Sequence, residues 1–463
     1  MKIRNLSQLT WLSVDAVKDA PVQTTNYVAD PGRVADLARR IREGELSPAD
    51  LARGYLDRIK VTEPVVKAWR EVCADTMVTE AEQRAKEVED GVVCGPLHGI
   101  PVGIKDIIDV AGVPTRCNSL SRADAAPATA DAEIVSALRA AGALILGKTQ
   151  TTEFAYFDPS PACNPHNIEH TPGGSSSGSA AAVAAGTVPA ALGTQTMASV
   201  NRPAAYCGIA AFKPSTRLFS TFGIEPLSTL YDTVGFYGWS VADAAAVFDA
   251  VCPTHARLGR KELRDSPLIV VALQDPFIDD ADDEIKKAVE RVAERLAGAG
   301  HAVEAKNSSV SFKQLYDLHI LTMEYEIGRI QRRLLDEPEG QVGIKLTETI
   351  KRGNKIADAA YLDARRKLDK VRTEFFDAFR GVDAFLWPAT PKTAPKGIAW
   401  TGEPKFISPW TALGGPIVTM PAGFAADGLP IGCLITGAPG SDFRFGQIAC
   451  RIAEAAEAHG IAS

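Results

Sequence analysis

The sequence predicts a single large α/β domain. Helix-like and strand-like segments alternate along the 463 residues, and no internal repeat or low-complexity linker separates them. Hydrophobic residues make up 46% of the chain and charged residues 23%, which is typical of a globular protein and excludes a disordered or fibrous chain. Because no boundary is visible, we expect one domain over residues 1–463 rather than a string of small ones.

The N-terminal half begins with two helices and continues with strands and helices in turn. The first helix ends at Gly44, and the second begins with Ser47 as its N-cap and Pro48 in its first turn. Short apolar runs predict strands, and longer periodic or alanine-rich runs that end at glycine predict helices. The expected elements are helices at 34–41, from 47 onwards, at 131–141 and at 179–185, an apolar run at 100–104, and strands at 143–146 and 188–192.

The same alternation continues in the C-terminal half. An apolar run over 268–273 predicts a strand, and apolar residues at helical spacing over 285–296 predict a helix that ends near Gly300. Residues 312–380 are charged and helical in pattern. A last strand is expected at 384–387, so the sheet resumes beyond the middle of the chain.

Charge and cysteine usage narrow the classes of partner and compartment. Lys and Arg total 50 against 57 Asp and Glu, and the net charge of −7 argues against nucleic acid or an anionic membrane as the main partner. No secretory leader pattern and no membrane-length apolar run is apparent. The eight cysteines form no C-x-x-C pair and the histidines no H-E-x-x-H pattern, so we expect a cytoplasmic protein without a metal site.

The segment 173–179 places three adjacent serines between glycines, immediately before the alanine-rich helix. Such a segment can be an ordinary turn, or it can present hydroxyls and N–H groups to developing negative charge. Residues 174–178 also match G-x-S-x-G, the nucleophile elbow of α/β-hydrolases, with Ser176 at its centre. The elbow requires a preceding strand, and the turn-like residues 164–172 argue against one. The elbow would also need a distant histidine, for which the candidates are His255, His301, His319 and His459.

Two further segments carry candidate catalytic groups. Residues 193–199 follow an expected strand, where a serine can lie beside free backbone N–H groups suited to an oxyanion, or the segment can be another hydroxyl-rich turn. Lys105 ends the apolar run 100–104. A lysine in such a place is usually solvated and inert, but burial beside hydroxyls lowers its pKa and lets it act as a general base. The residues alone leave both alternatives open.

Together the three segments resemble the amidase signature family of serine hydrolases. Ser175 and Ser199 are 199 − 175 = 24 residues apart, in agreement with the family spacing. The blocks that match are 96–106, 173–186, 193–199, 202–208 and 212–215, with further family-like stretches at 148–155, 232–235 and 428–432. The resemblance spans about residues 30–455. Its signature core covers about 95–250, and agreement is weakest in a more variable helical region at about 250–380.

The resemblance implies a mixed, twisted β-sheet sandwiched between helices, and a Ser–cis-Ser–Lys triad at Ser199, Ser175 and Lys105. Ser199 would attack the carbonyl carbon and become acylated. Ser175, held by a cis peptide after Gly174, would relay the proton to neutral Lys105. The oxyanion hole would be formed by backbone N–H groups around Thr196, Met197, Ala198 and Ser199.

The sequence departs from the family pattern next to the nucleophile. Members commonly have glycine there, whereas Met197 and Ala198 stand in this chain, and we expect their side chains to narrow the acyl pocket. Arg202 is expected either to bind a substrate carboxylate or to pair with nearby acids. The substrate-binding candidates that the resemblance implies are Gly174, Gln195, Arg202, Tyr231 and Trp410. Other aromatic or apolar residues in flanking segments, each equally able to be core, are Tyr156, Phe157, Leu230, Phe236 and Trp239.

We therefore expect an amidohydrolase that cleaves amide or carbamate (urethane-like) C–N bonds through an acyl-enzyme, with esterase side activity and no cofactor. The expected partner is a small, non-peptide substrate, with no nucleic acid and no membrane, and a homodimer is open by analogy. Two alternatives are a partner-dependent subunit of an aminoacyl-tRNA amidotransferase, against which the acidic charge counts, and a non-catalytic binding protein on the same fold.

Overall fold

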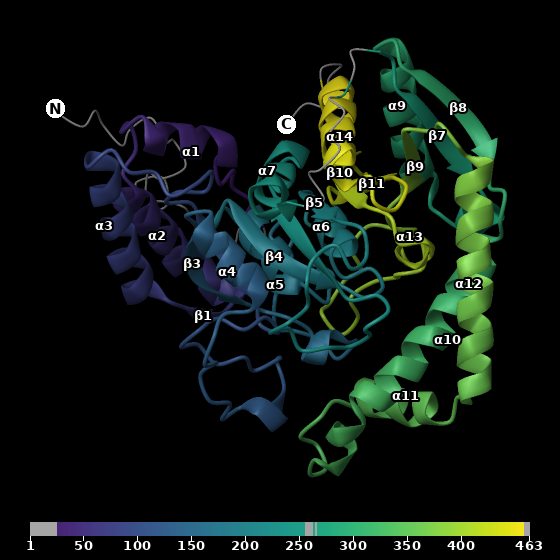
Figure 1. The fold of residues 1–463 in the computed structure, drawn as a ribbon, viewed down its shortest axis with the longest axis horizontal. Coiled ribbons are helices and arrows are strands. Elements are labelled where there is room, and N and C mark those ends of the chain that lie inside the picture. Colours follow the sequence, from purple (N-terminus) through teal and green to yellow (C-terminus); the bar gives the residue numbers. More distant parts are fainter. Residues whose placement is uncertain (1–25, 255–262, 264–265, 458–463) are drawn as a thin grey trace.

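An eleven-stranded mixed β-sheet runs through the protein (Figure 1). The computed structural model describes residues 26–254, 263 and 266–457. Across the sheet the order is β1-β3-β2-β4-β6-β5-β10-β11-β9-β7-β8. The strands are β1 (Trp69–Val72), β2 (Pro101–Lys105), β3 (Leu144–Thr149), β4 (Ala190–Gln195), β5 (Ala210–Lys213), β6 (Thr233–Gly238), β7 (Ile269–Gln274), β8 (Ala302–Asn307), β9 (Ala384–Pro388), β10 (Ile417–Phe424) and β11 (Pro430–Thr436).

Helices cover both faces of this sheet. On one face α5 (Ser177–Ala184) and α6 (Asn201–Tyr206) contact each other and the central strands, and on the other α7 (Val241–Val251) contacts β5 and β6. The remaining helices are α1 (Val34–Arg42), α2 (Pro48–Val66), α3 (Ala74–Glu89), α4 (Glu133–Ala140), α9 (Asp283–Gly298), α10 (Phe312–Ile330), α11 (Ile344–Asn354), α12 (Asp358–Ala378), α13 (Ser408–Leu413) and α14 (Asp442–Glu457). The expected single α/β domain, with a mixed sheet between helices, is confirmed.

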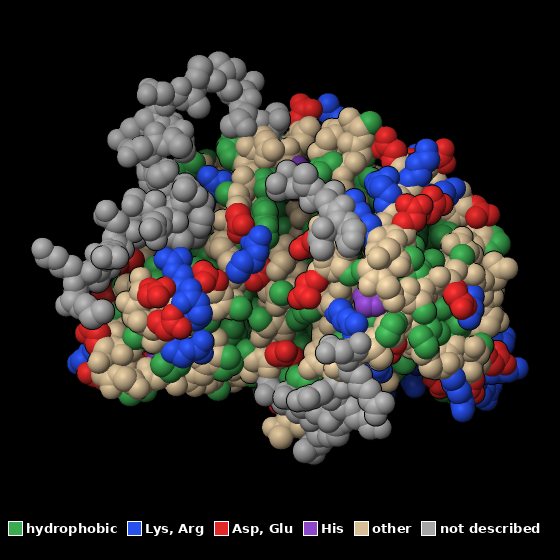
Figure 2. Space-filling model, turned by 90° about the horizontal axis from the view of Figure 1, so that it is seen from above, with side chains coloured by type: hydrophobic (Ala, Val, Ile, Leu, Met, Phe, Trp, Pro, Cys, Tyr) green, Lys and Arg blue, Asp and Glu red, His purple; other side chains and the backbone are tan. Residues whose placement is uncertain are grey.

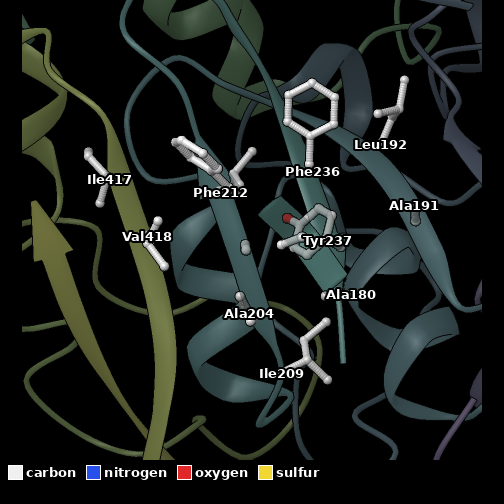
Figure 3. Close-up of a cluster of buried hydrophobic side chains, with 14 of the residues drawn as sticks. Ala180, Ala191, Leu192, Ala204, Ile209, Phe212, Phe236, Tyr237, Ile417 and Val418 are labelled. Atoms are coloured by element: carbon white, nitrogen blue, oxygen red, sulfur yellow. The ribbon is translucent and has the colours of Figure 1, made fainter. Parts of the chain in front are cut away.

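Strand β6 illustrates why both faces are covered. The ring of Phe236 packs against Phe248 of α7, with ring centroids 5.8 Å apart. The next residue, Tyr237, points to the other layer and donates a hydrogen bond from its hydroxyl to the carbonyl of Ser199 (3.2 Å). Successive side chains of a strand point to opposite faces, so a strand buried on both faces has no solvent-facing positions. Figure 3 shows Phe212, Phe236 and Tyr237 among the buried side chains of the central strands.

Most of the expected elements are present, with shifted ends. β4 begins two residues later than expected and runs to Gln195, so residues 193–195 belong to the strand rather than to a loop. Pairing with β6 along its whole length extends the strand. Ser47 precedes α2 as expected, but its side chain makes no capping hydrogen bond. The region expected to be helical over 312–380 contains α10, α11 and α12, which lie to one side of the molecule in Figure 1.

The surface carries both signs of charge. In Figure 2, Lys and Arg side chains are interspersed with Asp and Glu on the described part of the visible face. Among the described helices, none is long and apolar enough to cross a membrane. Of the four histidines that could partner a nucleophile elbow, His255 and His459 lie outside the described residues.

Candidate active site

The site forms where two parallel strands end side by side. β2 and β4 are neighbours, with Ile104 paired to Leu192, so their carboxyl ends open at the same edge of the sheet. β2 ends at Lys105 and β4 at Gln195. In sheets with parallel strands, ligands bind outside such carboxyl ends. The topology therefore brings the lysine and the segment before Ser199 together.

Lys105 contacts Ser175 directly. Its Nζ lies 2.7 Å from Oγ of Ser175, and the peptide bond between Gly174 and Ser175 is cis. Both side chains are buried. The carbonyl of Ser175 accepts a hydrogen bond from the N–H of Thr152 (3.0 Å), which fixes the main chain beside the lysine. Two of the three triad candidates are therefore in hydrogen-bond contact.

Burial decides the charge of Lys105. Its Nζ also contacts Oγ1 of Thr194 at 2.9 Å, but within the described residues no carboxylate lies at ion-pair distance. Loss of hydration lowers the pKa of Lys105 to about 7, although Asp232 and Cys117 act in the opposite direction. A substantial fraction of the lysine is therefore neutral at pH 7 and able to take up a proton.

Ser199 lies in the turn between β4 and α6 and is 8% exposed. Its carbonyl accepts hydrogen bonds from the N–H of Ser176 (3.3 Å) and from the hydroxyl of Tyr237. These bonds tie the turn to the segment that carries Ser175. The third triad candidate therefore lies in the same site as the first two.

The side chain of Gln195 holds the start of this turn. Its Oε1 accepts hydrogen bonds from the N–H groups of Val200 (2.9 Å) and Asn201 (3.0 Å), and its Nε2 donates to Thr411 of α13 (2.9 Å). The residue is fully buried and all three bonds are internal. Gln195, a substrate-binding candidate, therefore supports the turn instead of facing a ligand.

The backbone of the turn has free donors. Thr411 donates from Oγ1 to the carbonyl of Met197 (2.7 Å), which fixes the direction of the peptide that follows. In the part of the chain that the structure describes, the N–H groups of Met197, Ala198 and Ser199 have no protein acceptor. Unpaired N–H groups next to a nucleophile are what an oxyanion hole requires. These three residues are among the four that the resemblance implies for the oxyanion hole, and that role stays a prediction.

Thr196 is held from two directions. Its hydroxyl donates to the buried carboxylate of Asp232, whose pKa burial raises to about 6. Its carbonyl lies 3.0 Å from Nε2 of His319 on α10. Nδ1 of His319 lies 2.8 Å from the hydroxyl of Ser408 and 3.0 Å from its carbonyl. We assign the proton of the neutral ring to Nε2, because this tautomer both donates to Thr196 and accepts from the Ser408 hydroxyl. Burial lowers the pKa of His319 to about 4, which keeps the ring neutral at pH 7.

Arg202 is buried and bonded to main-chain oxygens. It donates to the carbonyl of Gly174 (2.7 Å), to the carbonyl of Gly402, and to Oγ1 of Thr401 (3.0 Å). Among the described residues no acid lies at ion-pair distance from Arg202, whereas its Nε has no acceptor and the residue lines the cavity over Ser199. Arg202 holds the carbonyl of Gly174, which belongs to the cis peptide before Ser175. Gly174 is therefore part of the site through its main chain.

Two adjoining cavities lead to Ser199. An inner cavity of about 20 Å³ lies over the serine, and an outer one of about 440 Å³ adjoins it. Residues that line both are Tyr156, Phe157, Met197, Met323 and Pro404. The inner cavity is completed by Ala155, Thr196, Ala198, Ser199, Arg202 and Leu227. The outer one is completed by Tyr316, Ile320, Glu324, Lys345, Glu348, Thr349, Arg352, Trp400 and Glu403.

Other aromatic candidates are placed in the core. Tyr231 is fully buried, and its hydroxyl bonds to Thr322 (2.6 Å). Trp410 is 2% exposed and packs among the aromatic rings around Trp387 and Phe385. Neither lines the two cavities, so the structure does not bring these two substrate-binding candidates to the site. The same holds for Leu230, Phe236 and Trp239.

The nucleophile-elbow alternative finds no support at Ser176. Its side chain is fully buried, and its Oγ donates to the carbonyl of Thr194 (3.2 Å). Turns, not a strand, precede it over residues 164–176. Ser176 therefore links the glycine–serine segment to β4. Its hydroxyl does not face a cavity that a substrate could enter.

A separate group of Glu87, Cys94 and His98 has ligand-type atoms within 4.8 Å of one another. Both ring nitrogens of His98 already face the main chain, Nδ1 the N–H of Cys94 and Nε2 the carbonyl of Arg84. The guanidinium of Arg84 donates to both Glu87 and Cys94. The guanidinium of Arg84 therefore already lies where a metal ion would have to bind to Glu87 and Cys94.

Sequence reasoning missed three supporting residues. Thr194 and Asp232 stand inside blocks that match the family, but nothing in those blocks alone marks their contacts with Lys105 and Thr196. His319 lies in the region of weakest resemblance. The sequence suggests it only as a partner for an elbow serine, and its actual contact spans more than a hundred residues of sequence.

Comparison with known proteins identifies the family. The family model Amidase matches residues 50–445. The chain is 31% identical to the A subunit of the glutamyl-tRNA(Gln) amidotransferase of Symbiobacterium thermophilum, over 90% of this chain and 95% of that protein. It is also 31% identical to the putative amidase AmiA2 of Mycobacterium tuberculosis, over 88% of this chain and 90% of the relative.

Solved structures agree with this assignment. The native peptide amidase from Stenotrophomonas maltophilia superposes with a TM-score of 0.76 at 30% identity, over 92% of this chain and 96% of that one. A crystal structure of an amidase superposes with a TM-score of 0.80 at 29% identity, over 90% and 98% of the two chains. This chain therefore belongs to the amidase family of C–N bond hydrolases.

Proposed function

We propose that the protein is an amidase that cleaves amide or carbamate C–N bonds of small, non-peptide molecules through an ester on Ser199. The observation that carries the proposal is the 2.7 Å contact between Nζ of Lys105 and Oγ of Ser175, in a site where burial lowers the pKa of the lysine to about 7. A neutral amine beside a hydroxyl accepts a proton, and a serine nucleophile needs such an acceptor at neutral pH.

The proton moves in two linked steps. As Oγ of Ser199 forms a bond to the carbonyl carbon, its proton passes to Ser175, and the proton of Ser175 passes to Lys105. The C–N bond then breaks, and the leaving nitrogen takes a proton back along the same path. Water then attacks the acyl ester and gives a proton to the Ser175–Lys105 pair. The ester bond breaks, Oγ of Ser199 takes a proton back, and the acid is released. The relay gives one proton to the leaving nitrogen and regains one from the attacking water, so it returns to its starting state after each turnover.

The negative charge that develops on the carbonyl oxygen is met by backbone donors. The N–H groups of Met197, Ala198 and Ser199 belong to a turn that Gln195, Thr411 and Asp232 hold in place. Donors fixed before the reaction stabilise an oxyanion without reorganisation, and removal of one such donor typically lowers kcat by about 10²–10³-fold. The methionine and alanine side chains do not remove these donors.

The outer cavity supports a substrate with an apolar or aryl part. Aromatic and apolar residues line one part of its wall, among them Phe157, Tyr316, Ile320 and Trp400. Charged residues line the rest: Glu324, Lys345, Glu348, Arg352 and Glu403. Amides, anilides and carbamates with an apolar or aryl group present the same carbonyl to Ser199. Esters of the same acids contain a better leaving group, so we expect esterase activity as well.

The test is labelling with a fluorophosphonate, followed by peptide mapping. We expect an adduct on Ser199 in the wild-type protein and none in Ser199→Ala, with cleavage of amides or carbamates lost in the same variant. Ser176→Ala is the matched control, because that serine is equally near the site but buried and internally bonded. An adduct on Ser176 would refute the proposal, and labelling of neither serine would favour a binding protein.

A second candidate function is favoured by one observation. Relatives of similar identity over nearly the whole chain are A subunits of glutamyl-tRNA(Gln) amidotransferases, from Symbiobacterium thermophilum among others. In that case the same Ser199 chemistry would release ammonia for transfer within a complex. We expect the isolated chain to hydrolyse amides by itself. Activity that appears only with added partner subunits would favour the amidotransferase instead.

A further inference from the structure

The inner and outer cavities meet at a neck. Five side chains line both: Tyr156, Phe157, Met197, Met323 and Pro404. Ser199 lines only the inner cavity, whose 20 Å³ has room for little more than one water-sized group. A substrate held in the outer cavity reaches Ser199 through the neck, so its carbonyl lies in the inner cavity while the bulk of the molecule stays in the outer one.

The aromatic side of the neck is fixed. The hydroxyl of Tyr156 bonds to Thr349 (2.8 Å), and the ring packs edge-on against Phe157 with ring centroids 4.8 Å apart. On the other side, the main chain of Met197 is held through its carbonyl by Thr411. Met197 itself is 5% exposed and lines both cavities, next to the residues of the turn that ends at Ser199. Its volume therefore sets how wide a group can lie next to the reacting carbonyl.

We propose that Met197 determines specificity, by selecting substrates whose carbonyl carries a narrow, unbranched group and whose aromatic or apolar bulk begins beyond the neck. The inference rests on the amidase function proposed above. An aryl ring bonded directly to the carbonyl would have to lie in the neck, against the thioether. A ring separated by two methylenes places narrow atoms there and the ring in the outer cavity.

The test compares two 4-nitrophenyl esters that differ only in this respect, those of 3-phenylpropanoic acid and benzoic acid. We expect the wild-type enzyme to prefer the phenylpropanoyl ester. In Met197→Ala, the ratio of kcat/KM for benzoyl to that for phenylpropanoyl rises about tenfold or more, because a few methylenes in a pocket change selectivity by that order. Met197→Leu, which nearly conserves volume, keeps the wild-type ratio within about twofold.

Met420→Ala is the matched control, because Met420 is also a buried methionine but lines neither cavity. We expect it to leave the ratio within about twofold of wild type, since it cannot contact either ester. A ratio that Met197→Ala does not move, or that Met420→Ala moves as far, would overturn the role of Met197.

Labelling of Ser199 by a small fluorophosphonate, measured in parallel, separates the two proposals. If the wild-type serine is labelled but the phenylpropanoyl ester is not cleaved, the specificity inference fails and the nucleophile stands. If Ser199 is not labelled at all, the proposed function fails, and the inference that rests on it fails with it.

Discussion

His319 donates a hydrogen bond from Nε2 to the carbonyl of Thr196, and this bond joins α10 to the turn that ends at Ser199. The contact is buried, and Ser408 fixes the ring from its other nitrogen. The carbonyl of Thr196 and the N–H of Met197 belong to the same planar peptide group. The bond that holds the carbonyl therefore also fixes the direction of this N–H. The orientation of the N–H of Met197, which we propose as an oxyanion donor, therefore depends on a residue far away in the sequence.

The first prediction concerns this bond. In His319→Leu the carbonyl of Thr196 loses its donor, and we expect kcat to fall about 5- to 150-fold, the equivalent of ~1–3 kcal/mol for an unpaired buried group. KM should change little. His319→Gln, whose amide N–H can replace the donor, should restore part of the rate. Steady-state kinetics on one ester would decide, and equal losses in both variants would show that shape rather than the hydrogen bond matters.

The second prediction concerns the proton acceptor. Lys105→Ala removes the amine in contact with Ser175, so we expect amide cleavage to fall below detection. We expect the variant to fold, because no buried carboxylate at ion-pair distance loses its partner among the described residues. Hydrolysis of an anilide measures the cleavage. Lys213→Ala controls for the loss of a fully buried lysine, since Lys213 donates to the carbonyl of Pro214 (2.6 Å) and hydrogen-bonds to no serine in the described part of the chain. Wild-type turnover in Lys105→Ala at neutral pH would refute the relay.

The third prediction concerns pH. The relay requires neutral Lys105, whose pKa is about 7, so kcat/KM should rise with pH and level off above about 7. Oγ1 of Thr194 accepts a hydrogen bond from the lysine and stabilises its charged form. Thr194→Val removes that acceptor, lowers the pKa of the lysine further, and should move the rising limb to lower pH. If the rise in kcat/KM moves to higher pH in this variant, or does not move, the titrating group is not Lys105.

The fourth prediction separates the possible roles of Arg202. Arg202→Leu leaves the carbonyls of Gly174 and Gly402 without their donor, so the free energy of unfolding should fall by about 1–3 kcal/mol for each. Urea unfolding, followed by fluorescence, measures it. Fluorophosphonate labelling of Ser199 should slow in the same variant, because the peptide before Ser175 is no longer held. A stable variant that loses only acidic substrates would instead restore the substrate-carboxylate role.

The parts of the site that sequence could predict are local. Lys105, Ser175 and Ser199 stand in short blocks whose residue types and spacing are recognisable without knowledge of the fold. Strands such as β8 could not be predicted in the same way, because its residues Ala302–Asn307 lie at an edge of the sheet, are mostly exposed and include Glu304 and Lys306. The length of β4 likewise depends on its partner β6 and not on its own polar end.

The supporting contacts could not be predicted for a related reason. Tyr231 and Trp410 are aromatic residues in segments that the family resemblance associates with the site, and whether such a ring faces a cavity or the core depends on which distant elements pack against it. Tyr231 lies against His319, with ring centroids 4.1 Å apart, and that neighbour has no periodic or compositional signal. Long-range pairs of this kind are properties of the fold.

The candidate catalytic residues and the wall of the outer cavity come from different parts of the chain. This separation affects how the substrate range of such an enzyme can be changed. Lys105, Ser175 and Ser199 come from one stretch of chain, whereas much of the outer cavity comes from α10, α11 and the loop around Trp400. A chimera that exchanges 312–404 for the same stretch of a relative would graft a new wall onto unchanged chemistry. Such grafts succeed only if the incoming segment also brings a donor for Thr196, so residue 319 sets the boundary of what recombination can exchange.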